Sequence, residues 1–114
     1  QNGVTLSLDG YKFEKKGDDW GIITEASFTM CNDAAGTIYP DVVFMINDKN
    51  GENQKLKRIK LSYAYYDGEC FNKVSPLDLS VSGIKNIKTI KLYAEEYDNF
   101  LVAVTLDVNL SSSS

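Results

Sequence analysis

The stretch "KTIKLYAEEYDNFLVAVTLDVNL", residues 88–110, decides the fold class. Its second half alternates apolar and polar side chains, which is typical of a strand with one buried face. The residues "YDN" at 97–99 interrupt the pattern with the polar types that turns favour. The stretch therefore predicts an antiparallel hairpin with arms over 87–96 and 100–110. Its predicted inward row is Phe100, Val102, Val104, Leu106, Val108 and Leu110.

The same two-residue period runs through most of the chain, and no segment carries a helical apolar stripe. In 20–31 it predicts one buried face made of Trp20, Ile22, Ala26, Phe28 and Met30. Turn signals rich in Gly, Asn and Asp separate short runs, which favours an antiparallel sandwich or barrel of seven to nine strands. Residues 74–84, "VSPLDLSVSGI", leave a short helical turn after Pro76 open. The strands expected are 4–8, 10–15, 20–31, 38–48, 54–66, 69–74, 79–83, 87–96 and 100–110.

Composition places the chain among single-domain globular proteins. It has 114 residues and a formal net charge of −4, and this acidic balance argues against a nucleic-acid partner. The densest basic run, "KLKRIK" at 55–60, has the pattern of a strand with one solvated face. No apolar run approaches the roughly 20 residues needed to span a bilayer. We expect one domain over residues 1–110 and a frayed serine tail over 111–114.

The cysteines and the first residue point to export. The chain begins with Gln1 in place of Met, as a chain does after removal of a signal peptide, although a trimmed sequence would look the same. Cys31 and Cys70 are the only cysteines. A pair in a small exported domain predicts one disulfide, and the alternative is two free thiols.

The absence of histidine removes the usual general base, the Ser-His-Asp and Cys-His systems and most zinc sites. No phosphate loop or dinucleotide fingerprint is present, so no cofactor is expected. The pairs Asp18–Asp19 and Glu95–Glu96 are sequence neighbours, which point to opposite faces of a strand. Neither is a natural catalytic couple, and the sequence predicts a protein without enzymatic activity. A glycosidase would need two carboxylates that converge across a cleft.

Two groups of residues are candidates for binding. Asp48, Asn50 and Glu52 gather the oxygen ligands that calcium prefers, but the EF-hand spacing fails. A hairpin turn around Asn50-Gly51 is the simpler interpretation, and it makes a metal site unexpected. Exposed tyrosines can serve as contact anchors for a sugar or a protein. The candidates for such a surface are Tyr66, Tyr93 and Tyr97.

Residues 32–52, "NDAAGTIYPDVVFMINDKNGE", resemble FxLYD-type domains, which are small exported bacterial β-sandwiches. Ile46 stands in place of that family's Leu and Asn47 in place of its Tyr, and its later Pro-Gly turn is missing. The resemblance covers about 20 residues and implies an immunoglobulin-like sandwich in the cell envelope, with no catalytic residues. The residues that match are Asn32, Tyr39, Val42, Phe44, Ile46, Asp48 and Gly51.

The leading hypothesis is therefore an exported bacterial β-sandwich that binds an unknown protein or glycan partner, as a monomer or weak homodimer. One alternative is a calcium-dependent carbohydrate-binding module, with the ion in the Asp48 loop. A second is a structural subunit that assembles by adding a strand to a neighbour's sheet. In each case Val42, Phe44 and Ile46 are predicted to face the core, with Val43 and Met45 on the other side.

Overall fold

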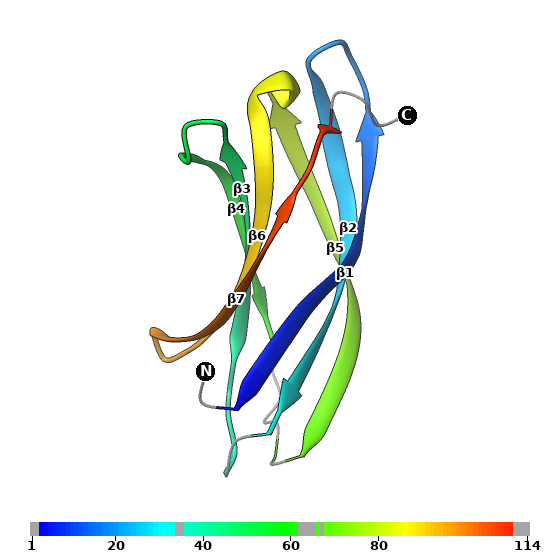
Figure 1. The fold of residues 1–114 in the computed structure, drawn as a ribbon. Helices are drawn as coiled ribbons and strands as arrows, with labels where there is room; N and C mark the ends of the chain where they lie inside the picture. Colours follow the sequence, from blue (N-terminus) through cyan, green and yellow to red (C-terminus); the bar gives the residue numbers. More distant parts are fainter. Residues whose placement is uncertain (1–2, 34–35, 62–65, 67, 111–114) are drawn as a thin grey trace.

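The computed structural model describes residues 3–33, 36–61, 66 and 68–110. Over these residues it is all-β, with a short 3₁₀ helix, η1, at Ile84–Asn86 (Figure 1). The predicted serine tail at 111–114 lies outside the described residues. The strands are β1 (Val4–Lys15), β2 (Trp20–Asn32), β3 (Asp41–Asp48), β4 (Asn53–Lys60), β5 (Glu69–Ser82), β6 (Ile87–Glu96) and β7 (Asn99–Asp107).

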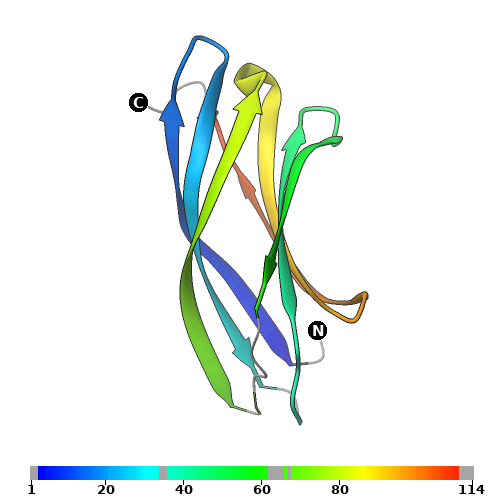
Figure 2. The ribbon, with the colours of Figure 1, turned by 180° about the vertical axis from the view of Figure 1, so that it is seen from behind.

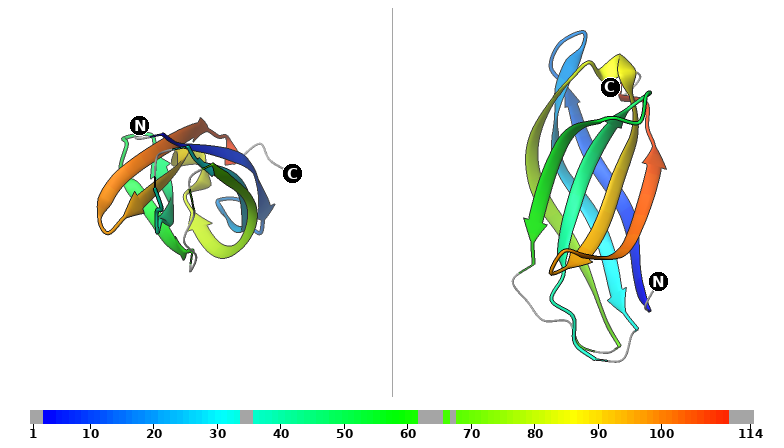
Figure 3. Two further views of the ribbon diagram at one scale, coloured as in Figure 1. Left: turned by 90° about the horizontal axis from the view of Figure 1, so that it is seen from below. Right: turned by 90° about the vertical axis from the view of Figure 1, so that its left-hand side faces the viewer.

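The strands form two antiparallel sheets packed face to face. One has the order β1-β2-β5 and the other β4-β3-β6-β7 (Figure 3). In immunoglobulin lettering these are A-B-E and C′-C-F-G, because β4 pairs with β3 on the C-F-G side. The prediction of an immunoglobulin-like β-sandwich of seven to nine strands is confirmed, with seven strands among the described residues.

The core lies between the sheets and is built from alternate residues of each strand. Val42, Phe44 and Ile46 are fully buried and face the opposite sheet, as predicted. Val43 is also 0% exposed, although its register places it on the outer face, opposite Arg58 and Tyr93. The outer face of β3 is therefore covered at Val43.

The predicted inward face of β2 is wrong at its start. Ile23 is 0% exposed, whereas Trp20 is 43% exposed. The register against both neighbouring strands shifts between Ile23 and Glu25. One residue, Thr24, is added there, and a bulge of this kind moves every side chain before it to the other face. Ala26, Phe28 and Met30, which follow the bulge, face inward as predicted.

Residues 69–82, which we expected as two strands with a turn after Pro76, form the single strand β5 (Figure 2). The helical turn comes later, in η1. Pro76 is tolerated because β5 is an edge strand with only β2 beside it. Leu77 and Asp78 lie opposite the single residue Thr24, and Asp78 has a φ of 48°. This irregularity is what interrupted the alternation in the sequence.

The hairpin of β6 and β7 is confirmed, but its inward row is only partly right. Val102 and Val104 pack against the core and Leu110 is fully buried. Phe100 is 51% exposed while its neighbour Leu101 is 6% exposed. Val102 pairs with Ala94 and Phe100 pairs with Glu95, so Leu101 between them is an extra residue in β7. This bulge reverses which side chains point inward at the beginning of β7. Leu106, also predicted inward, is 39% exposed.

Cys31 and Cys70 form the predicted disulfide, with an S–S distance of 2.07 Å. They are direct cross-strand partners in β2 and β5. The bond therefore lies within one sheet, whereas antibody domains link the B and F strands across their two sheets. No helix in the described ranges is both long and apolar enough to cross a membrane.

Candidate binding surface

Tyr97 occupies the two-residue turn between β6 and β7 and is 76% exposed. Tyr97 and Asp98 both have positive φ, at 49° and 68°. A tight hairpin turn with two such residues normally uses Asn or Gly, because a larger side chain is strained there. A bulky tyrosine at this position is a local cost to stability, and costs of this kind collect at functional sites.

Tyr39 faces this turn from the segment that precedes β3. Its ring centroid lies 6.3 Å from that of Tyr97, with an angle of 42° between the planes. The backbone N–H of Tyr39 donates to Glu96 Oε2 at 2.9 Å, which fixes the segment to the end of β6. Tyr39 is 52% exposed. The two rings form an aromatic surface at the end of the sandwich that carries the β6–β7 turn, and we call them the tyrosine pair.

The structure does not bring the three predicted tyrosines together. Tyr93 lies on the outer face of the four-stranded sheet, where Lys91 Nζ sits 5.8 Å from its ring centroid. Tyr66 is 60% exposed in the connection before β5, and its N–H donates to Glu69 Oε1. Among the described residues, neither ring contacts that of Tyr97. Of the three, Tyr97 is the one with a ring contact to another aromatic residue in the described part of the chain.

Tyr39 was not among the predicted binding residues. The interactions that place it join residues about 57 positions apart, and hydrophobic periodicity reports only which face of a strand is buried. The one signal in the sequence was its position within residues 32–52, the stretch compared above with the FxLYD-type pattern. That pattern marks Tyr39 without indicating a partner for it.

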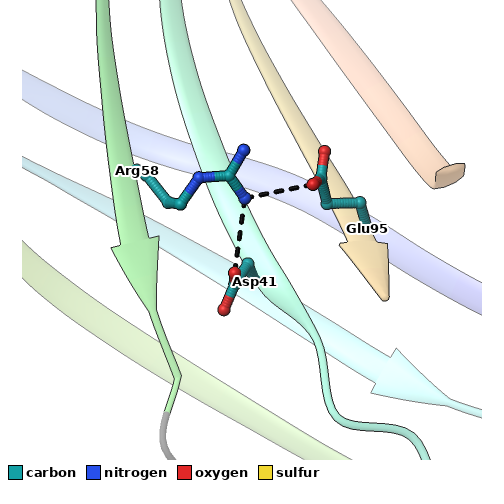
Figure 4. Close-up of polar contacts among 3 residues, drawn as sticks. All are labelled: Asp41, Arg58 and Glu95. Atoms are coloured by element: carbon teal, nitrogen blue, oxygen red, sulfur yellow. Dashed lines mark hydrogen bonds and ion pairs between the residues drawn. The ribbon is translucent and has the colours of Figure 1, made fainter. Parts of the chain in front are cut away.

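The outer face of the four-stranded sheet carries an arginine with two carboxylate partners (Figure 4). Arg58 Nη1 lies 3.1 Å from Glu95 Oε2 and 3.3 Å from Asp41 Oδ2. The hydrogen bond to Glu95 is the main reason that the pKa of Arg58 is raised. Glu96 points elsewhere, to Tyr39, so the neighbouring glutamates do not converge. This agrees with the expected opposite faces.

The Asp48 loop is the β3–β4 hairpin turn that the sequence favoured. Asp48 Oδ1 accepts the N–H groups of Asn50 and Glu52, both at 2.9 Å. Gly51 has a φ of 82°, a conformation that glycine adopts without strain. Within the described ranges no group of three or more Cys, Asp or Glu side chains could hold a metal ion. Calcium binding by Asp48, Asn50 and Glu52 stays an untested alternative.

Comparison with known proteins identifies the fold. No family model matches the chain, and no curated protein matches it. The chain is similar to part of a putative β-galactosidase from Bacteroides fragilis, with a TM-score of 0.65, 9% identity and coverage of 95% of this chain and 16% of that one. It is also similar to part of a β-glucuronidase from glycoside hydrolase family 2, with a TM-score of 0.68, 9% identity and coverage of 96% and 11%.

A third similar structure is Bacteroides uniformis β-glucuronidase 2, with a TM-score of 0.64, 9% identity and coverage of 94% of this chain and 13% of that one. At such identities the likeness shows a shared β-sandwich fold alone. The chain spans only 11 to 16% of the length of these proteins.

Proposed function

We propose that this chain is an exported, non-catalytic β-sandwich domain that binds a glycan through the tyrosine pair. The observation that carries the proposal is Tyr97, a 76% exposed aromatic residue at positive φ in a two-residue turn. Asn or Gly would fit this turn with less backbone strain than a tyrosine does. Strain of this kind collects at functional sites, and contact with another molecule is the role we assign to the exposed ring.

Two tilted tyrosine rings suit a sugar, whose C–H groups form apolar patches between polar hydroxyls. Each ring offers a broad apolar face, and each phenol can exchange hydrogen bonds with sugar hydroxyls. Tyr39 is also held by Glu96 before a ligand arrives, which lowers the entropy cost of binding. The names of the structural neighbours, a galactosidase and two glucuronidases, add that such sandwiches occur within glycan-processing proteins.

The disulfide is compatible with export, and an accessory role fits the small share of those larger proteins that the chain covers. The family resemblance to FxLYD-type domains, which is a separate proposal, agrees with an envelope location. A protein partner that contacts the same two rings is the second candidate, because tyrosine is enriched at interface hot spots.

The test is a glycan array followed by calorimetry on the neutral oligosaccharide that binds best. The variant Tyr39→Ala/Tyr97→Ala should weaken binding at least about tenfold, since two anchor residues are removed. Trp20→Ala is the control, because Trp20 is also a partly exposed aromatic residue but lies at the opposite end, in the strand that follows the β1–β2 turn. Equal binding by the double variant and the native chain, or no glycan bound at millimolar concentration, would overturn the proposal.

A further inference from the structure

The end of the sandwich opposite the tyrosine pair contains a hollow of about 460 Å³. This volume lies within the roughly 300–1,000 Å³ of small-molecule sites. The hollow lies between the β3–β4 turn, η1 and the segment after β7, which Figure 1 shows together at the end away from the β6–β7 turn. Its lining residues are Lys49, Lys85, Ile87, Lys88, Val108 and Asn109, and we call it the lysine hollow.

Backbone hydrogen bonds hold the segments that carry the three lysines. Lys49 N donates to Asn86 O at 2.8 Å, which fixes the β3–β4 turn against η1. Val108 N donates to Lys88 O at 2.9 Å, which fixes the chain after β7 against the beginning of β6. The backbone positions of three cationic residues are therefore fixed relative to one another, with Lys49 from one part of the sequence and Lys85 and Lys88 from another.

The charges in the lysine hollow are of one sign. Within the part of the chain that the structure describes, no ion pair involves Lys49, Lys85 or Lys88, whereas Lys12, Lys16 and Arg58 each contact a carboxylate. Asp48, beside Lys49 in sequence, directs Oδ1 to backbone N–H groups of its own turn. A concave group of cations on a chain of net charge −4 attracts anions locally against the overall charge.

Two of the residues that line the hollow, Ile87 and Val108, are apolar. Ile87 is 4% exposed, and Val108 packs against the core. A volume of about 460 Å³ also equals about fifteen water molecules at roughly 30 Å³ each, which exceeds the need of one inorganic ion. Three cations beside an apolar side chain match a ligand that carries both anionic groups and a ring with an apolar face.

We propose that the lysine hollow binds an oligosaccharide that carries carboxylate or sulfate groups. The ammonium groups of Lys49, Lys85 and Lys88 pair with the anionic groups, and a sugar ring packs against the half-buried Val108. This second site rests on the proposed function for its choice of a sugar as the carrier of the charge. It uses no residue of the tyrosine pair.

The experiment is calorimetry at low ionic strength with trigalacturonate, its neutral counterpart galactotriose, and citrate as a free anion. Trigalacturonate should bind, and Lys49→Gln/Lys85→Gln/Lys88→Gln should weaken it about tenfold or more, at roughly two- to fivefold for each exposed charge pair. The control Lys57→Gln/Lys60→Gln/Lys73→Gln removes the same total charge outside the hollow and should bind within about twofold of the native chain. High salt should weaken the native interaction.

Three results would overturn the inference: equal losses in both triple variants, galactotriose binding as well as trigalacturonate, or citrate binding as well as trigalacturonate. The first indicates general attraction, the second a neutral sugar site and the third a site for free anions. Tyr39→Ala/Tyr97→Ala separates the two proposals, because it should lose the neutral array ligand and keep trigalacturonate. Failure at one end of the sandwich then leaves the result at the other end intact.

Discussion

Arg58 Nη1 lies 3.1 Å from Glu95 Oε2, so an arginine of β4 reaches across β3 to a carboxylate of β6. Val43 of β3 stands directly between these strands, opposite Arg58 in register, and is 0% exposed on the outer face. Arginine commonly lays its methylene stem over apolar surface while its charged end stays in water. We infer that the stem of Arg58 covers Val43 and that the carboxylates hold it there.

Two substitutions of Arg58 should separate the contribution of packing to the free energy of unfolding from the contribution of the ion pairs. Arg58→Ala should lower the free energy of unfolding by about 1–2 kcal/mol, because both the ion pairs and the cover of Val43 are lost. Arg58→Met keeps an apolar stem and should lose less than about 1 kcal/mol. Urea denaturation measures both, with Lys60→Ala as a surface control on the same strand. An equal loss of unfolding free energy in the Met and Ala variants would show that the ion pairs, and not the packing on Val43, account for the contribution of Arg58.

The disulfide should contribute more stability than any single surface interaction. It closes a loop of 39 residues, for which the chain-entropy model gives about 4 kcal/mol. Because β2 and β5 already pair along their length, we expect Cys31→Ser/Cys70→Ser to lose about 2–4 kcal/mol. Denaturation with and without a reductant measures this. On reduction, the free energy of unfolding of the native chain should fall to that of the variant. An unchanged free energy of unfolding in the presence of the reductant would show that the disulfide is not formed.

Substitutions of Asp48 in the β3–β4 turn test whether this residue stabilises the turn or binds calcium. Asp48→Ala removes the acceptor of two N–H groups and should cost about 1–2 kcal/mol. Asp48→Asn keeps an acceptor oxygen in place and should cost less than about 0.5 kcal/mol. Melting temperatures in millimolar calcium and in chelator should agree for the native chain. A rise with calcium that Asp48→Asn abolishes would favour the metal-loop alternative, since a ligand stabilises the state that binds it.

The period-two pattern predicted the strands and the hairpins well, because alternation reports burial directly. It failed at Ile23 and Leu101, where one added residue changes which face points inward. Bulges depend on the register between two strands, and a single strand's sequence carries no register. The same reason explains why nine expected strands became seven: irregular points at Asp9 and Asp78 interrupt the pattern without ending the strand.

The candidate sites depended even more on long-range contacts. Tyr97 was predicted as an exposed contact residue, and its exposure follows from its place in a turn. Its partner Tyr39 and the lysine hollow both require segments that are distant in sequence. Lys49, Lys85 and Lys88 have no shared motif, and only the β-sandwich topology brings the turns that carry them to one end.

Tyr11 gives the chain a specific loss of stability at alkaline pH. Its ring packs against the core from β1, and this burial raises the pKa of Tyr11 above its ordinary value of 10.0. The unfolded chain therefore releases this proton at lower pH than the folded chain does. The contribution to folding is fully present below pH 10.0 and is lost as the pH rises through the folded-state pKa. Burial of the charged phenolate is the cause.

Tyr11→Phe removes this titration and keeps most of the packing. Urea unfolding at about pH 8 and about pH 11, on either side of the tyrosine pKa, should show a larger loss of stability for the native chain than for Tyr11→Phe. Every other titratable group is present in both proteins, so its contribution cancels in the difference. Tyr97→Phe is the matched control, because it makes the same substitution at a side chain that is 76% exposed. Equal losses in Tyr11→Phe and the native chain would show that another group causes the alkaline effect.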